Sequence, residues 1–201
     1  YKPFKTGQLL AMGASQFRDP AIPVLPGTKQ ELAALSTSLG STNQGAWGVT
    51  RLENQAFTQT RINQNLGKQP FSALHVSTHA QFQPGQVEAS YIQLWDQKLT
   101  LNSLNAIDWD RSNADLIVLS ACQTALGDMD AANGFAGLAL KAGVPSAIGT
   151  LWSINDQSTT QLMKGFYSNL PESRTKAQAL QSAQVAAIHG SDGSTAMKAP
   201  Y

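Results

Sequence analysis

Two apolar segments of this chain end in residues that can carry out covalent chemistry. FSALHVSTH (71–79) ends in His79, and NADLIVLSAC (113–122) ends in Cys122, the one cysteine of the chain. A thiolate is a strong nucleophile, and a nearby imidazole stabilises it or returns its proton to a departing amine. Neighbouring parallel strands lie about 4.8 Å apart, so two adjacent strand ends would bring the groups together. The pair indicates nucleophilic catalysis, although a lone cysteine at a strand end is more often a core residue.

The other histidines fit structural roles better. His75 shares a strand face with His79 but stands about 13 Å from it, so both cannot reach one thiol. We expect His75 to be a hydrogen-bonded residue of the core or of a layer interface. His189 ends a predicted helix and is expected to cap it or to lie on the surface. No third or fourth ligand accompanies the histidines, so neither zinc nor another cofactor is expected.

The elements that must position these residues alternate between strand and helix patterns. Continuous apolar runs, as in Leu116 to Leu119, are typical of parallel strands covered on both faces. The alternation predicts parallel βαβ units in one α/β domain over residues 1–201, a three-layer sandwich with a mostly parallel central sheet. The predicted strands are 7–13, 46–52, 71–79, 113–122 and 144–152, with two hairpin strands at 90–95 and 98–101. The predicted helices are 28–40, 58–66, 133–143, 156–170 and 175–189, and 17–27 is an irregular, proline-rich loop. Thr28 and Glu31 have the spacing of a capping box at the start of the first helix, and Thr58 introduces the second.

Composition argues against several classes of partner. The formal net charge is +1 and the basic residues are scattered, so nucleic acid is not expected as a partner. No apolar run approaches the roughly 20 residues that cross a bilayer, and the first residues lack the pattern of a signal peptide. A single cysteine excludes an internal disulfide and fits a reducing, cytoplasmic compartment.

The motifs resemble those of a known family. LHVSTHAQF, ADLIVLSACQTALGD, GFAGLALKAGVPSAIGTLWSINDQSTTQLMKGFY and KAQALQSAQVAAI closely resemble the CHAT domain, a caspase-like cysteine peptidase domain of bacteria that is often attached to tetratricopeptide repeats. Caspases, gingipains and separases are related to it. The resemblance implies a caspase-like α/β/α sandwich. It also implies a piece of a larger protein, clipped at both ends, with N-terminal tetratricopeptide repeats or another regulatory partner.

The resemblance implies a His–Cys dyad that hydrolyses peptide bonds through an acyl-enzyme. The histidine of the family's TH motif falls on His79, and the nucleophile of its SAC motif falls on Cys122. Backbone N–H groups at Cys122 and Ala80 would hold the oxyanion. The family usually has glycine where this chain has Ala80, so the donor survives only if the backbone there suits a residue with a Cβ.

Three residues are candidates for a substrate pocket. Metacaspase relatives have an aspartate two positions before the cysteine, and Ser120 stands there in this chain. Separases resemble the chain at LWSIND, so Asp156 is a candidate partner for a basic substrate side chain. Capping of the following helix by Asn155 or Asp156 explains the motif equally well. Trp152 is expected in the core or in the wall of the pocket.

Two functions remain open at this point. The first is a cysteine endopeptidase acting on a protein or peptide substrate under the control of an attached domain or partner. The alternative is a catalytically silent protein-binding module with the same fold. The intact His79 and Cys122 favour the peptidase, whereas Ala80 and the clipped ends modestly favour the module. A redox-sensing role for Cys122 lacks a resolving cysteine.

Overall fold

The computed structural model describes residues 7–39, 47–81, 83, 86, 88–121, 143–150 and 156–189. Cys122, Trp152 and all but the last residue of the helix expected at 133–143 lie outside this range. Within it, every helix is too short or too polar to cross a lipid bilayer.

A parallel sheet forms the centre of the described part of the chain. Its order is β2 (Gly48–Glu53), β1 (Gln8–Gly13), β3 (Ala73–Ser77), β7 (Leu116–Ser120) and β8 (Ala147–Gly149), and each neighbouring pair is parallel. The predicted α/β class is therefore confirmed. The two segments that lead to His79 and Cys122 form neighbouring strands, β3 and β7, as expected.

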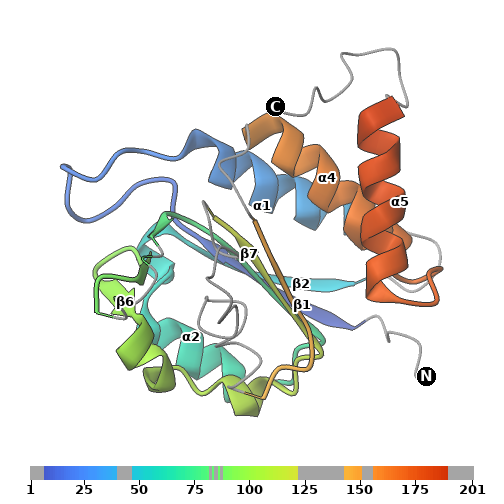
Figure 1. The fold of residues 1–201 in the computed structure, drawn as a ribbon. Helices are drawn as coiled ribbons and strands as arrows, with labels where there is room; N and C mark the ends of the chain where they lie inside the picture. Colours follow the sequence, from blue (N-terminus) through green and yellow to red (C-terminus); the bar gives the residue numbers. More distant parts are fainter. Residues whose placement is uncertain are drawn as a thin grey trace.

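Helices cover both faces of this sheet (Figure 1). On one side lie α1 (Pro26–Leu39) and α4 (Asp156–Asn169), with α5 (Lys176–His189) packed against α4. On the other side lie α2 (Gln59–Leu66) and an antiparallel sheet of β4 (Ala80–Gln81), β5 (Tyr91–Gln93) and β6 (Lys98–Thr100). Three short 3-10 helices complete the described elements: η1 (Asn54–Ala56), η2 (Leu101–Ala106) and η3 (Trp109–Ser112).

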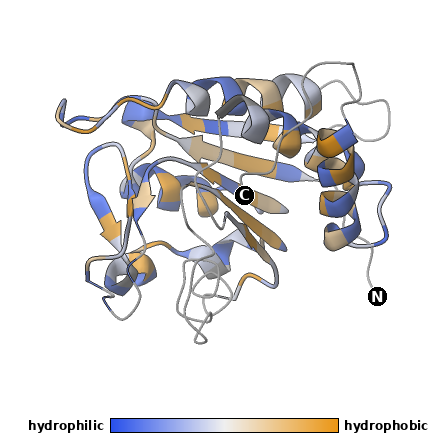
Figure 2. Ribbon diagram, turned by 45° about the horizontal axis from the view of Figure 1, so that its top comes forward, coloured by the Kyte–Doolittle hydropathy of each residue, from blue (hydrophilic) through white to orange (hydrophobic). Residues whose placement is uncertain are grey.

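Side-chain alternation along the strands divides the core in two. In β1, Leu10 and Met12 face the α2 side, whereas Leu9 and Ala11 face α1 and α4. Both sets are fully buried, as a sheet covered on two faces requires. Figure 2 shows the result, with largely hydrophobic strands between helices of mixed hydropathy.

Strand β3 ends earlier than its sequence suggests. Its last residue is Ser77, and the Thr78 hydroxyl then donates to the carbonyl of Gln93 at 2.7 Å. The Gln93 N–H donates in turn to the carbonyl of His79 at 2.9 Å, so the chain leaves the large sheet for the small one. His79 therefore does not continue the strand that carries His75. The expectation that both stand on one strand face is wrong.

The start of α1 also differs from expectation. The helix begins at Pro26, a residue suited to a first helical position, rather than after Thr28. Thr28 and Glu31 therefore form no capping box, and both side chains are buried against the sheet. In α2 the expectation holds, because the Thr58 hydroxyl caps the helix by accepting from Arg61 N–H.

Candidate active site

The carboxyl ends of β3 and β7 stop at the same row of the sheet. Ser77 of β3 lies directly opposite Ser120 of β7. His79 follows Ser77 by two residues, and in the sequence Cys122 follows Ser120 by two. In open α/β sheets, functional groups gather at this edge, in the loops that follow the strands.

The His79 ring is held by the loop between β1 and α1. Its Nε2 lies 2.8 Å from the carbonyl oxygen of Pro23, and its ring centroid lies 5.3 Å from that of Phe17. A carbonyl only accepts hydrogen bonds, so Nε2 is the donor and carries a proton. Nδ1 is then the nitrogen that is left for exchange with a thiol. Sequence reasoning missed the contribution of Pro23, because a backbone carbonyl carries no residue-type signal.

Ala80 leaves its backbone N–H outside the ladder between β4 and β5. It is paired with Ile92 in the small sheet, next to the hydrogen-bonded pair His79–Gln93. Hydrogen-bonded and non-hydrogen-bonded pairs alternate in an antiparallel ladder, so the N–H of Ala80 points away from β5. Asn54 and Asn113 are the described non-glycine residues with positive φ. Ala80 is not among them, so the Cβ is accommodated without left-handed strain.

A buried carboxylate lies beneath the Ser77–Ser120 row. Glu31 of α1 is only 4% exposed. Its Oε2 accepts from Ser77 Oγ at 2.6 Å, and its Oε1 accepts from Ser120 Oγ at 2.8 Å. His75 Nε2 lies 3.2 Å from Oε1, in a direction outside hydrogen-bond geometry, so this contact is electrostatic. His75 Nδ1 lies 3.3 Å from the hydroxyl of Tyr167 on α4, which confirms the expected layer-facing role of His75.

This environment controls the ionisation of two groups. Burial raises the pKa of the Glu31 carboxyl, but the charge of His75 and the hydrogen bonds outweigh it, so the pKa lies below its ordinary value. Burial, with a smaller effect of the Glu31 charge, raises the pKa of Tyr167 well above its ordinary value. Glu31 is therefore an anion at neutral pH, and the Tyr167 phenol is neutral.

A glycine at this edge allows β1, β3 and the start of α1 to pack closely together. Gly13 lies beside Ser77, and a Cβ there would stand 2.1 Å from the carbonyl oxygen of Ser77 and 2.8 Å from Thr28 Cγ2. The glycine therefore lets the first turn of α1 approach the strands closely. Sequence reasoning missed Glu31. The available signal was Gly13, Ser77 and Ser120, each ending an apolar strand, together with a glutamate on the apolar face of α1.

The candidate pocket residues occupy different positions. The Ser120 side chain is 9% exposed, and its hydroxyl is engaged by Glu31, so its part in a substrate pocket stays a prediction. Asp156 is the first residue of α4. His189 is exposed at the end of α5, as expected. No three His, Cys, Asp or Glu side chains lie close enough to bind a metal ion in the part of the chain that the structure describes.

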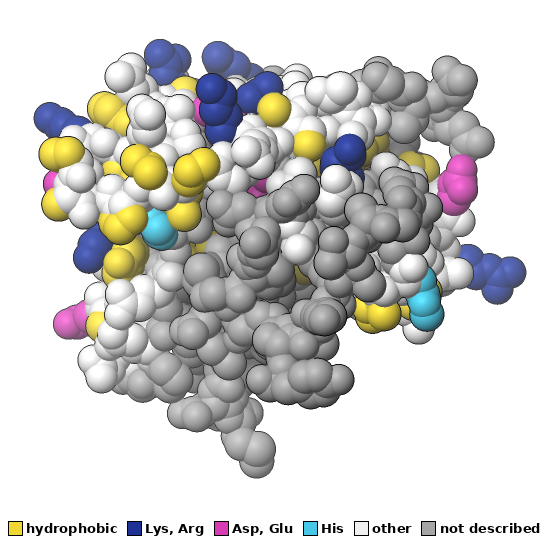
Figure 3. All heavy atoms as spheres, turned by 90° about the horizontal axis from the view of Figure 1, so that it is seen from above, with side chains coloured by type: hydrophobic (Ala, Val, Ile, Leu, Met, Phe, Trp, Pro, Cys, Tyr) yellow, Lys and Arg dark blue, Asp and Glu magenta, His cyan; other side chains and the backbone are white. Residues whose placement is uncertain are grey.

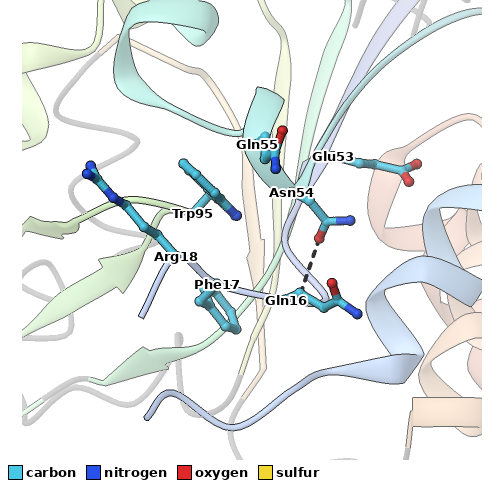
Figure 4. A pocket seen from close by; sticks show the side chains of 7 residues that line it. All are labelled: Gln16, Phe17, Arg18, Glu53, Asn54, Gln55 and Trp95. Carbon is cyan, nitrogen blue, oxygen red and sulfur yellow. Dashed lines mark hydrogen bonds between the residues drawn. The ribbon is translucent and has the colours of Figure 1, made fainter. Parts of the chain in front are cut away.

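A pocket of about 460 Å³ opens beside His79 at the carboxyl ends of β1 and β2 (Figure 4). Its walls are residues 16–18, residues 53–55 and Trp95. Asn54 shapes it, because its Oδ1 accepts from the N–H groups of Ser15 at 2.9 Å and Gln16 at 3.2 Å. Phe17 belongs both to the pocket wall and to the ring contact with His79, so this one ring connects the pocket to the candidate base.

The loop that carries Pro23 is apolar and exposed. Residues 20–26 are all proline or aliphatic, and Val24 is 62% exposed. Figure 3 shows hydrophobic side chains gathered at the end of the molecule where this loop extends in Figure 1. Exposed apolar surface of this kind marks a site of contact with another molecule more often than isolated exposed residues do.

Comparison with known proteins agrees with the motifs in the sequence. The chain matches the sequence model of the CHAT domain over residues 2–201. No curated protein matches it. Because the family match spans nearly the whole sequence, the chain belongs to the CHAT domain family, a family related to caspase-like peptidases.

Proposed function

We propose that this chain is a cysteine endopeptidase that cleaves peptide bonds with His79 and Cys122. The observation that carries the proposal is the pairing of Ser77 with Ser120 on neighbouring parallel strands. Each serine precedes one member of the dyad by two residues, so the imidazole and the thiol follow the same row of the sheet.

The contacts of His79 support a specific role for each group in the proposed reaction. The Cys122 thiolate attacks the scissile carbonyl carbon, and the N–H groups of Ala80 and Cys122 stabilise the resulting oxyanion. The C–N bond breaks as protonated His79 donates from Nδ1 to the departing amine, which leaves a thioester. Water then attacks the thioester, His79 takes the proton of that water, and the carboxylic acid leaves as the thiolate re-forms.

The pocket beside His79 receives the leaving side of the substrate. His79 protonates the departing amine, so the residues after the cut must pass over the histidine. The pocket lies at the carboxyl ends of β1 and β2, on the side of β3 away from β7, and is connected to His79 through Phe17 of the loop after β1. Trp95 and Phe17 supply flat apolar walls for a substrate side chain. On the acyl side, Asp156, Ser120 and Trp152 remain the proposed specificity residues.

The dyad is tested by the pH dependence of Cys122 alkylation with iodoacetamide, which needs no known substrate. We expect wild type to react with a midpoint well below the value of about 8.5 for an ordinary thiol. His79→Ala moves the midpoint to that ordinary value, whereas His189→Ala, a change at an exposed histidine, leaves it in place. Identical midpoints in wild type and His79→Ala contradict the dyad.

Peptide cleavage separates the peptidase from the silent module. A peptide library should yield products with wild type and none with Cys122→Ala. If a partner protein binds wild type and Cys122→Ser equally and neither cleaves it or any library peptide, the chain is a binding module. Attached tetratricopeptide repeats, a regulatory partner and a cytoplasmic location stay proposals.

A further inference from the structure

We infer that Glu31 is a positioning residue for the His79–Cys122 dyad, tying the last residues of β3 and β7 together and so setting the separation of the two catalytic groups. The inference rests on the proposed peptidase function and extends it to a residue that contacts neither substrate nor dyad.

The first support is the geometry of the tie. Ser77 and Ser120 are opposite each other in the sheet, and both hydroxyls donate to the Glu31 carboxylate. Ser77 Oγ reaches Oε2 at 2.6 Å, whereas Ser120 Oγ reaches Oε1 at 2.8 Å and Oε2 at 3.1 Å. Charge-assisted hydrogen bonds of this length are the strong ones, so one carboxylate links both strand ends.

The second support is where the tie acts. The pairing of β3 with β7 ends at the row of Ser77 and Ser120. Beyond it, Thr78 and His79 bond to Gln93 in the small sheet, so the β3 chain turns away from β7. The ladder no longer holds the two backbones together past this row. Glu31 therefore acts at the last row in which β3 and β7 are paired, two residues before His79 and Cys122 in the sequence.

The third support is that the surroundings hold the carboxylate in place. His75 of β3 lies 3.2 Å from Oε1, and Tyr167 of α4 lies behind His75. Thr28 Oγ1 of α1 lies 3.2 Å from Ser77 Oγ and adds a further polar contact. These are the polar groups that the described structure places around the carboxylate. A buried group with this many partners has one position, because any displacement leaves polar atoms unsatisfied.

The test measures Cys122 alkylation by iodoacetamide against pH in Glu31→Gln, Ser77→Ala and Ser120→Ala. Loss of the tie lets the His79 and Cys122 ends separate, which weakens the stabilisation of the thiolate. Glu31→Gln should therefore move the midpoint toward that of His79→Ala and slow labelling at pH 7 by about tenfold, the effect of about 1.4 kcal/mol. Each serine variant should give a smaller shift in the same direction.

Ser112→Ala is the matched control. Ser112 is also a fully buried serine, donating to the carbonyl of Trp109 and accepting from Ala114 N–H, but it lies before the amino end of β7. Its replacement should lower the melting temperature about as much as Ser120→Ala and leave the alkylation midpoint unchanged. This contrast separates positioning from a general loss of stability.

The outcomes are distinguishable. A wild-type midpoint equal to that of His79→Ala defeats the proposed peptidase, whatever Glu31 does. A depressed wild-type midpoint that Glu31→Gln, Ser77→Ala and Ser120→Ala all retain, despite lower melting temperatures, overturns the positioning role alone. If Glu31→Gln does not fold, the two serine variants decide, because each removes one arm of the tie and keeps the buried charge.

Discussion

The two histidines of β3 and its extension differ in what surrounds them. His75 is 0% exposed, and its ring nitrogens face the Glu31 carboxylate and the Tyr167 hydroxyl. His79 is half-buried and takes its orientation from the backbone carbonyl of Pro23 and the ring of Phe17. The same residue type thus serves structure inside the sheet and, in the proposed function, chemistry where the chain leaves it. What decides the role is whether solvent and substrate reach the ring.

The largest expected effects are those of His75→Ala, which should mainly lower stability, and of His79→Ala, which should mainly lower peptide cleavage. Removing His75 leaves the buried Glu31 charge without its partner, which should lower the free energy of unfolding by about 3–5 kcal/mol. Removing His79 should change that free energy by about 1 kcal/mol but reduce peptide cleavage by about 10²- to 10⁴-fold. Urea denaturation and kcat/KM measure the two. A large stability loss in His79→Ala would break the comparison.

Gly13→Ala probes the close packing between the strand end at Ser77 and the first turn of α1. The new Cβ would meet the Ser77 carbonyl and the Thr28 side chain, so both the β3 backbone at Ser77 and the first turn of α1 must move. Overpacking of this kind should lower the free energy of unfolding by about 1–3 kcal/mol. At Gly67, the nearest atom to a Cβ lies at an ordinary 3.4 Å. Gly67→Ala is therefore the control, and equal losses in both variants would argue against close packing at Gly13.

The pH dependence of the free energy of unfolding tests whether the buried Glu31 carboxylate next to His75 is ionised in the folded protein. Its pKa is lowered in the folded state from an ordinary value of 4.5. The ionised group therefore contributes stability that is fully present above about pH 4.5 and is lost as pH falls through the folded pKa. The difference in unfolding free energy between wild type and Glu31→Gln should shrink between pH 5 and pH 3, as followed by urea denaturation. A constant difference over this range would contradict the assignment.

The smallest expected effect concerns the pocket beside His79. Trp95→Ala removes one apolar wall, which should raise KM about three- to tenfold for peptides that extend past the cut. Substrates whose leaving group is only a dye amine place nothing in this pocket, so their KM should not change. These dye-amine substrates are the internal control. Equal changes in KM for both kinds of substrate would contradict the assignment of this pocket to the residues after the cut.

The sequence predicts the fold well because its signals are local. Apolar runs bounded by glycine and proline place the strands of the central sheet, and their alternation with helices predicts the layers. Thr78 misleads, because a β-branched residue favours a strand, whereas its hydroxyl bonds to Gln93 and ends β3. Thr28 and Glu31 mislead likewise, because their spacing matches a capping box while three elements converge on the carboxylate.

The candidate site is less predictable than the fold. Residue type and strand position single out His79 and Cys122 as candidates. The groups that orient His79 come from a loop far from it in sequence, and Pro23 contributes only its backbone carbonyl. Such contacts depend on tertiary structure and leave no pattern in the residues. The roles of His79, Cys122, Ala80, Ser120, Trp152 and Asp156 stay predictions.

The orientation of the His79 ring depends on a segment that faces outward. Pro23 belongs to a stretch of proline and aliphatic residues whose Val24 side chain is largely open to solvent. A second protein that bound this segment would shift the Pro23 peptide unit and thereby rotate the His79 imidazole without contacting it. Control of the chemistry from a distance requires no new pocket and no rearrangement of the sheet.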